Sequence, residues 1–264
     1  MKHWINPKEA AEAIRRGTGK GVKIAILDSG VERDHPQLSG VRWADDIAIV
    51  QEGREIRTEP GAGCDLFGHG TAVAGIIHRV APEAEIGSFR VLGGATDSKS
   101  KIVHEGAMLA IEKGYRVLNC SLGCTISQHV LMYKDWVDLA YLRGSHVVAA
   151  CNNHDFNRQE WPAFFSSVIA VNMARCQRDG VIYYRRDSLV EFAAGGVDVE
   201  VPWIAGSQRR MTGSSFAAPR VAGLLARLIS EYPDLSTTDA KAILHRLALP
   251  WSRDLLDGQS PPTS

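Results

Sequence analysis

The segment VKIAILDSG, residues 22–30, begins with an apolar run and ends just beyond an acidic residue. Similar short apolar runs occur at residues 86–92, 116–120, 146–151 and 168–171. Continuous runs rich in Val, Ile and Ala, without polar alternation, are typical of strands buried on both faces of a parallel sheet. We therefore expect residues 22–27 to form a strand inside such a sheet.

Segments with helical periodicity alternate with these runs. Their ends are marked by capping residues, such as Asn6 with Pro7 at one start and Gly114 at one end. Strand and helix alternation predicts an α/β fold, a three-layer sandwich with a mostly parallel central sheet flanked by helices. The helices are predicted at residues 7–16, 71–80, 102–113, 130–142, 216–231 and 236–247.

Two other segments do not follow this alternation. Residues 178–212 have β-branched and aromatic residues with turn signals, so we expect a hairpin-like excursion there. Residues 252–264 are predicted to form a loose C-terminal tail. No internal repeat or long linker divides the chain, so residues 1–264 are expected to form a single domain.

The composition excludes several classes of protein. The chain has 264 residues, 30 basic and 30 acidic side chains, and 45% hydrophobic residues. This balance argues against disorder and gives no electrostatic basis for binding nucleic acid or an anionic membrane. No apolar run approaches the ~18 residues of a membrane span. Residues 1–13 lack the apolar core of a signal peptide, so a cytoplasmic location is expected, with a processed secreted form left open.

The chain contains five cysteines, at positions 64, 120, 124, 151 and 176. We interpret them mainly as buried free thiols in a reducing compartment. A zinc site that includes Cys120 and Cys124 and a disulfide in an exported form remain alternatives. We expect no metal centre and no cofactor. Because Cys151 lies close to a candidate site residue described below, sensitivity to thiol reagents is also expected.

Three segments carry side chains suited to catalysis. Asp28 follows a buried strand, GHGTAVAGI (residues 68–76) places His69 at a helix start, and GSSFAAPRVAG (residues 213–223) places two serines at another. A helix N-terminus disfavours imidazolium, which suits a general base, and its N–H groups stabilise an oxyanion. Each segment alone also fits a structural role, as a turn cap, a helix-start histidine or an N-cap serine.

Together, and in this order, the three segments resemble the motifs of the subtilisin-like serine peptidases over about residues 20–230. The resemblance implies a serine endopeptidase that hydrolyses peptide bonds through an acyl-enzyme. By similarity, Ser215 is the nucleophile, His69 the general base and acid, and Asp28 the group that orients the imidazole. Ser214 competes with Ser215 on sequence alone, and the family frame G-x-S-x-A-x-P selects Ser215.

The resemblance also implies an oxyanion donor after the strand VVAACNN, residues 147–153. The register selects Asn153, and the backbone N–H of Ser215 would be the second donor. Asn152 stands where the family usually has a glycine that walls the specificity pocket. It is therefore expected near the substrate and is the weaker candidate for the donor.

Further residues are expected to bind the substrate. The segment Ser121-Leu122-Gly123 resembles the family strand that pairs with an extended peptide, with residues 96–98 across the cleft. Glu160 precedes Trp161-Pro162 and corresponds to the pocket floor, so its carboxylate would favour Lys or Arg before the cut. Ordinary strand, loop or surface roles are the alternatives for these residues.

The function and its partners stay partly open at this level. The expected partner is a polypeptide or peptide substrate, and an inhibitor or propeptide partner is unknown. The alternatives are a dedicated processing peptidase or transpeptidase, including a macrocyclase, and a non-catalytic peptide-binding module on the same fold. Residues 75–82 lack the insertion that often builds a calcium site in this family, so that site is not expected.

Overall fold

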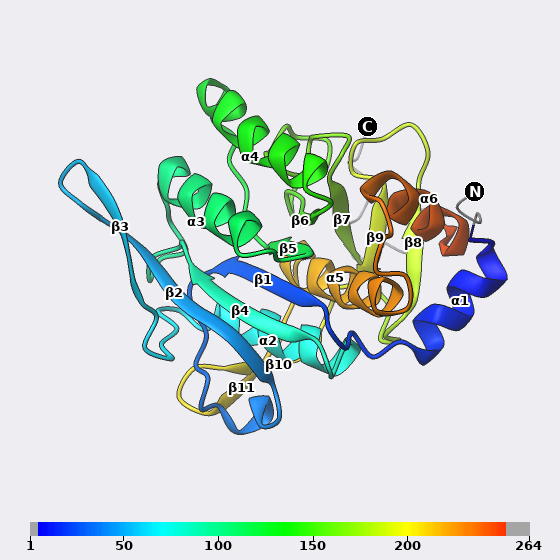
Figure 1. The fold of residues 1–264 in the computed structure, drawn as a ribbon, viewed down its shortest axis with the longest axis horizontal. Helices are drawn as coiled ribbons and strands as arrows, with labels where there is room; N and C mark the ends of the chain where they lie inside the picture. The colour runs from blue at the N-terminus through cyan, green and yellow to red at the C-terminus, as the bar shows by residue number, and fades with distance from the viewer. Residues whose placement is uncertain (1–4, 252–264) are drawn as a thin grey trace, which may run out of the picture.

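The computed structural model describes residues 5–251, which fold around one large sheet covered by helices on both faces (Figure 1). The strand order is β12-β8-β9-β7-β6-β5-β1-β4-β2-β3. Its strands are β1 (Lys23–Asp28), β2 (Arg42–Glu52), β3 (Glu55–Pro60), β4 (Glu85–Arg90), β5 (Val117–Cys120), β6 (His146–Ala150), β7 (Ile169–Ala174), β8 (Ile182–Tyr184), β9 (Phe192–Gly195) and β12 (Leu249–Pro250). A separate antiparallel pair consists of β10 (Val199–Trp203) and β11 (Ser207–Met211).

The helices include all six predicted ones, with ends that differ by no more than two residues. Two short 3₁₀ helices, η1 and η2, were not predicted. The bounds are α1 (Pro7–Arg16), α2 (His69–Val80), α3 (Ser100–Glu112), α4 (Val130–Leu142), α5 (Ser214–Glu231), α6 (Thr237–Leu247), η1 (Pro36–Leu38) and η2 (Ser127–His129).

The central strand β1 pairs in parallel with β4 on one side and β5 on the other. Its side chains alternate between two cores: Ile24 and Ile26 pack with α1, α2, α5 and α6, whereas Ala25 and Leu27 pack with α3 and α4. Both faces of the strand are therefore buried, which explains its continuous apolar sequence. The predicted three-layer sandwich with a mostly parallel sheet is confirmed.

The carboxyl ends of β1 and β5 lie side by side, because Leu27 pairs with Cys120. The chain leaves the sheet there through Asp28 and Ser121. Loops at this edge of a parallel sheet carry the polar groups of α/β proteins, since the strands themselves are buried. The topology thus brings these two segments, more than ninety residues apart in sequence, to one edge.

Two parts of the fold differ from the sequence prediction. The β2–β3 hairpin, which protrudes at the left of Figure 1, was not predicted, because its strands are half-exposed and mix charged with apolar residues. The single excursion predicted for residues 178–212 is wrong. Strands β8 and β9 join the main sheet, and β9 pairs in parallel with β7, whereas β10 and β11 pair only with each other. The predicted tail, residues 252–264, lies outside the described residues.

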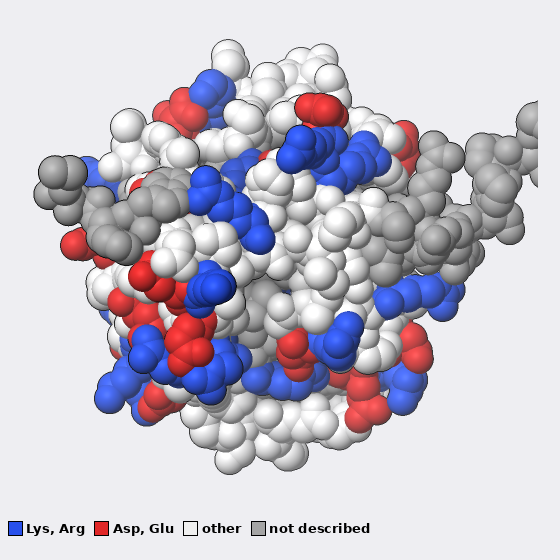
Figure 2. All heavy atoms as spheres, turned by 90° about the vertical axis from the view of Figure 1, so that its right-hand side faces the viewer, with Lys and Arg blue, Asp and Glu red and all other residues white. Residues whose placement is uncertain are grey.

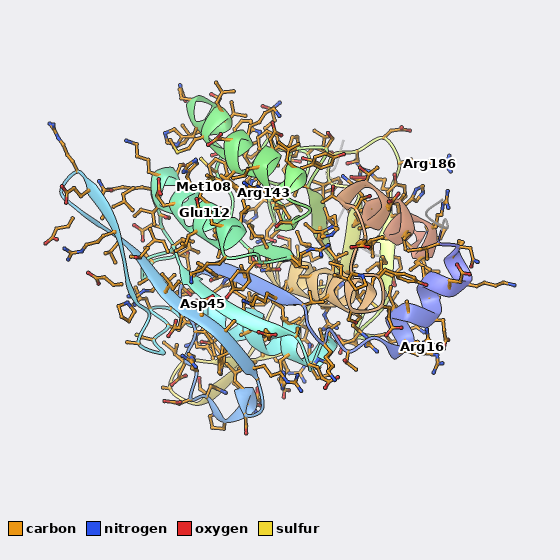
Figure 3. The ribbon with its side chains drawn as sticks, in the orientation of Figure 1. Arg16, Asp45, Met108, Glu112, Arg143 and Arg186 are labelled. Atoms are coloured by element: carbon orange, nitrogen blue, oxygen red, sulfur yellow. The ribbon has the colours of Figure 1, made fainter. Side chains whose placement is uncertain are left out.

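Polar contacts tie the layers together at the surface. Asp45 of β2 accepts hydrogen bonds from Lys113 at 3.0 Å and from Tyr115 at 2.7 Å, just beyond the end of α3 (Asp45 and Glu112 are labelled in Figure 3). The face that carries α1 shows basic and acidic side chains next to one another (Figure 2), as in the pair Arg16 and Glu231 at 3.3 Å.

Within residues 5–251, no helix is both long and apolar enough to cross a membrane.

Candidate active site

Asp28 and His69 form a buried acid–imidazole pair at the carboxyl edge of the sheet. Asp28 is the last residue of β1 and is fully buried. Its Oδ1 and Oδ2 lie 2.8 and 2.9 Å from Nδ1 of His69, and Oδ1 also accepts a 2.8 Å hydrogen bond from the backbone N–H of Ser29. These donors replace the water that burial removes from the carboxylate.

His69 is the first residue of α2, and the local backbone fixes its position. The preceding Gly68 has φ +113°, and a Cβ there would lie 2.5 Å from the ring of Trp203. Burial by itself would lower the pKa of His69. The charge of Asp28, its hydrogen bond and the charge of Asp65 outweigh burial, so the pKa is raised above its ordinary value. The imidazole is therefore well suited to accept a proton.

Asp65 organises the loop that leads to His69. Its Oδ1 accepts hydrogen bonds from the hydroxyl of Ser29 and from the N–H groups of Phe67 and Gly68 at 2.8–3.0 Å. Its Oδ2 accepts from the N–H and hydroxyl of Thr71 at 2.8 and 2.6 Å. The sequence analysis missed this residue. An acidic residue four positions before a helix-start histidine is the signal that would have identified it.

Ser215 lies in the first turn of α5 and is half-buried, whereas its neighbour Ser214 is fully buried. The hydroxyl of Ser214 donates to the carbonyl of Cys151 at 2.6 Å. This hydroxyl therefore points into the protein interior. The hydroxyl of Ser215 makes a long 3.5 Å contact to the carbonyl of Ser121. Ser215 is therefore the serine of this pair that is available to a substrate.

Ser215 and His69 line the same cavity, which has a volume of about 760 Å³. The ring of His69 also lies 5.4 Å from that of Phe216, the residue after Ser215, measured between centroids. The structure thus brings His69 and Ser215 into one cavity, and Asp28 lies buried behind the imidazole of His69.

Asn153 and Asn152 have different environments. Oδ1 of Asn153 accepts a 2.7 Å hydrogen bond from the N–H of Ser214, which anchors its amide beside the start of α5. Oδ1 of Asn152 instead accepts from the N–H groups of His154 and Asp155 at 3.0 Å. The Asn152 side chain also hydrogen-bonds Glu160. Only Asn153 is therefore bonded directly to the segment that carries Ser215.

Glu160 lies against Gly123. A Cβ placed on Gly123 would come within 2.4 Å of Cδ of Glu160, so a larger residue here would require the Glu160 side chain to move. Burial raises the pKa of Glu160, although the charge of Arg158 and the hydrogen bond from Asn152 act to lower it. The carboxylate is partly desolvated and lies beside residues 121–123, which follow β5 and were predicted to bind substrate.

Residues predicted for both walls of the cleft line the cavity. They are Ser121, Leu122 and Gly123 from one predicted wall and Thr96 and Ser98 from the other. The hydroxyl of Ser121 donates to the carbonyl of Ser215 at 2.9 Å, which fixes this wall to the start of α5.

The five cysteines are free thiols, but they are not all buried. Cys64 is exposed and Cys124 is half-buried, so the prediction of buried thiols is wrong for these two, which lie in loops at the sheet edge. Burial, with a smaller contribution from the charge of Glu160, raises the pKa of Cys151 to about 12. This argues against the predicted thiol sensitivity at Cys151, because the thiolate is the reactive form.

The metal alternatives gain no support from these residues. Among residues 5–251, no three His, Cys, Asp or Glu side chains gather in a way that would hold a metal ion. Helix α2 runs without interruption from His69 to Val80, through the segment where the calcium-site insertion was not expected.

This combination of fold and polar residues is the architecture of a serine peptidase. The model of the Subtilase family matches residues 19–260. Thermitase from Thermoactinomyces vulgaris is 30% identical over 84% of this chain and 80% of its own length. Subtilisin DY from Bacillus licheniformis is 30% identical over 84% of this chain and 82% of its own length.

Solved structures give the same result. A psychrophilic protease, S41, superimposes with a TM-score of 0.74 at 26% identity, over 87% of this chain and 83% of its own. A cold-adapted subtilisin-like serine proteinase gives a TM-score of 0.73 at 25% identity, over 88% and 83%. The chain therefore belongs to the subtilase family, and it is a subtilisin-like serine endopeptidase.

Proposed function

We propose that Asp28, His69 and Ser215 are the catalytic triad of this endopeptidase. The observation that carries the proposal is the buried Asp28–His69 pair in a cleft that Ser215 also lines. In the proposed reaction the hydroxyl of Ser215 leaves the carbonyl of Ser121 and donates to Nε2 of His69. Such hydrogen bonds are often long without substrate and tighten when it binds.

In the first half of the reaction, Oγ of Ser215 attacks the peptide carbonyl carbon and its proton passes to Nε2 of His69. The imidazolium then protonates the leaving amine, and the C–N bond breaks to give an ester on Ser215. In the second half, water attacks the ester, His69 takes its proton and returns it to Ser215, and the acid is released. Asp28 holds the imidazole through Nδ1 and stabilises its charged form in both halves.

The oxyanion formed in each half requires fixed donors. The amide of Asn153 is held by Ser214 through its oxygen, which leaves its –NH₂ group as a donor. The N–H of Ser215 belongs to the first turn of α5, whose amides lack intrahelical acceptors. These two groups support a pre-organised oxyanion hole that needs no metal ion.

The substrate is proposed to be an extended polypeptide that pairs with Ser121, Leu122 and Gly123. Backbone pairing gives affinity that depends little on sequence, as suits an endopeptidase. The partly desolvated carboxylate of Glu160, behind Gly123, supports a preference for Lys or Arg before the cut. Asn152 holds this carboxylate and thereby shapes the pocket.

Labelling with a fluorophosphonate tests the triad. Mass spectrometry is expected to place one adduct on Ser215, and His69→Ala is expected to abolish labelling while the circular dichroism spectrum stays unchanged. No adduct on folded protein would favour the peptide-binding alternative.

Product masses test the reaction: gain of water indicates hydrolysis, whereas loss of water from a linear peptide indicates macrocyclisation. The cytoplasmic location remains a prediction, which cell fractionation tests.

A further inference from the structure

Ser215 and Pro219 both lie in α5, four residues apart. In an α-helix the carbonyl of each residue accepts a hydrogen bond from the N–H four residues later, but proline has no N–H. The proline ring also crowds that same carbonyl. The carbonyl of Ser215 therefore lacks its ordinary helical donor, and the turn that carries the proposed nucleophile needs a donor from elsewhere in the fold.

Ser121 supplies this missing donor. Its hydroxyl donates to the carbonyl of Ser215 at 2.9 Å. Ser121 directly follows β5, and β5 packs beside α5 (Figure 1). The carbonyl of Ser121 in turn accepts the long 3.5 Å contact from the hydroxyl of Ser215. Ser121 thus contacts Ser215 at two atoms, one on the backbone and one on the side chain.

A second buried side chain orients Ser121. Asn119 of β5 is fully buried, and its Nδ2 donates to the hydroxyl of Ser121 at 3.0 Å. A serine hydroxyl has one proton to donate and can also accept. Because the carbonyl of Ser215 can only accept, the proton of Ser121 goes to that carbonyl, and Asn119 must present its –NH₂ group. The hydrogen bonds therefore run in one direction, from amide to hydroxyl to carbonyl.

The amide of Asn119 is unfavourable for the stability of this core. Its Oδ1 is buried and has no hydrogen-bond partner among the described residues. An unpaired buried polar group destabilises the folded state, and an apolar side chain of similar size would remove this penalty. What the amide provides in return is the –NH₂ donor to Ser121. This contact gives a reason for an amide at a position that packing alone would fill with an apolar residue.

Strand β5 also links these hydrogen bonds to the acid–imidazole pair. It pairs in parallel with β1, and Cys120 lies opposite Leu27, the residue before Asp28. Asp28 in turn holds the imidazole of His69. Because Asn119 belongs to β5, the hydrogen bonds that begin at its amide fix the start of α5 relative to the strand pair that positions the base.

We propose that Asn119 and Ser121 are a positioning pair, in which Asn119 acts through the hydroxyl of Ser121 to set the place of Ser215. This inference rests on the proposed function of Ser215 as the nucleophile. Loss of either donor lets the first turn of α5 move, which displaces both the hydroxyl and the backbone N–H of Ser215. A displacement of about 1 Å can lower a rate about 10²-fold. The side chain of Ser121 thus holds α5, and its backbone remains for a peptide substrate.

Single substitutions test each member of the pair. Ser121→Ala is expected to lower kcat about 10-fold to 100-fold with little change in KM, because the backbone of residue 121 still binds the peptide. Asn119→Ala is expected to lower kcat about 3-fold to 30-fold, because Ser121 keeps its proton but loses the group that orients it. The rate of fluorophosphonate labelling at Ser215 should fall in parallel. The double variant Ser121→Ala/Asn119→Ala should have a kcat no lower than Ser121→Ala, since Asn119 acts through that hydroxyl.

Pro219→Ala gives the sharper test, because it returns an N–H at the position that can donate to the carbonyl of Ser215. In this background, Ser121→Ala is expected to lower kcat by less than about 3-fold, since two substitutions that act on one carbonyl are not additive. An equal loss of kcat with and without Pro219→Ala overturns the proposal.

Two buried residues away from these hydrogen bonds are the matched controls. Ser88 of β4 is fully buried and its hydroxyl has no partner within residues 5–251, whereas Asn172 of β7 accepts from the N–H of Met173 at 2.8 Å. Ser88→Ala and Asn172→Ala are expected to keep the parent kcat.

Labelling of the parent protein separates this inference from the proposed triad. A parent that carries no label on Ser215 overturns both. A labelled parent whose Ser121→Ala and Asn119→Ala variants keep its kcat and its labelling rate overturns the positioning pair alone. Urea denaturation establishes that each variant is folded under the assay conditions, and if Asn119→Ala does not fold, Ser121→Ala with and without Pro219→Ala still decides the proposal.

Discussion

The carboxylate of Asp65 accepts a 2.8 Å hydrogen bond from the hydroxyl of Ser29, the residue that directly follows Asp28. This contact joins the end of β1 to the loop before α2, so the two segments that carry Asp28 and His69 share one buried acid. Ser29 also lies 3.3 Å from Oδ1 of Asp28 through the same hydroxyl. The position of the imidazole therefore depends on a residue that does not touch it.

We predict that Asp65→Asn lowers kcat/KM about 10²-fold, because its amide cannot accept all the hydrogen bonds that hold the loop and His69 shifts. Loss of the Asp65 charge also lowers the pKa of His69, so the acidic limb of the pH–rate profile moves to lower pH. Asp138→Asn, on the exposed face of α4, is the control. An unchanged rate with an unmoved acidic limb would show that Asp65 does not position the base.

The two adjacent serines are expected to separate catalysis from stability. Ser215→Ala should abolish fluorophosphonate labelling and leave the free energy of unfolding nearly unchanged. Ser214→Ala should keep the label but lower that free energy by about 1–3 kcal/mol, because the buried carbonyl of Cys151 loses its donor. Labelling and urea denaturation of both variants provide the check, and loss of the label in Ser214→Ala with the fold intact would reverse the assignment.

The neighbouring asparagines give a second matched pair. Asn153→Asp keeps an oxygen for the N–H of Ser214 but removes the –NH₂ donor, so kcat is expected to fall about 10²–10³-fold with little change in KM. Asn152→Ala should change kcat only slightly, because that side chain holds the 152–155 turn and Glu160. Steady-state kinetics on one peptide decide the matter, and the opposite order of effects would assign the donor to Asn152.

Glu160 is expected to set the preference for the residue before the cut. The parent should cleave an Arg peptide about 10-fold to 100-fold faster in kcat/KM than its Leu counterpart, because the partly desolvated carboxylate forms a charge-assisted hydrogen bond with a guanidinium and none with Leu. In Glu160→Gln this advantage should disappear, with Leu turnover retained. Equal or lower turnover of the Arg peptide by the parent would end this hypothesis.

His146 is expected to weaken the fold in acid. Burial, and then the charge of Arg116, lower its pKa to about 4, while a backbone interaction with Leu235 opposes them. The unfolded chain takes up this proton near pH 6.5, but the folded chain does so only near pH 4. Stability therefore falls as the pH decreases through this window, by about 3 kcal/mol in total.

The variant His146→Gln tests this contribution, since other groups also titrate in the same range. Urea denaturation of both proteins between pH 7 and pH 4 gives the difference in unfolding free energy. That difference should change with pH in the variant's favour as the pH decreases. A difference that is constant across the range would contradict the depressed pKa.

The sequence by itself determined the α/β class, the six helices and the central strands, because apolar runs and capping residues act locally. It also determined the identity of Asp28, His69 and Ser215 as candidates, since each lies in a specific motif. It did not reveal the β2–β3 hairpin, whose half-exposed strands lack a clear period, or the pairing of β9 with β7. Short strands acquire their partners only from the rest of the sheet.

Only the tertiary structure decided how the side chains around the cleft are used. The family motif selects Ser215 over Ser214, and the structure supplies the physical difference, because Ser214 is buried with its hydroxyl on the carbonyl of Cys151. Asp65 was not recognised, because its role arises from contacts between segments far apart in the chain. Hydrogen-bond geometry and desolvation are properties of such contacts. They cannot be inferred from the amino-acid sequence alone.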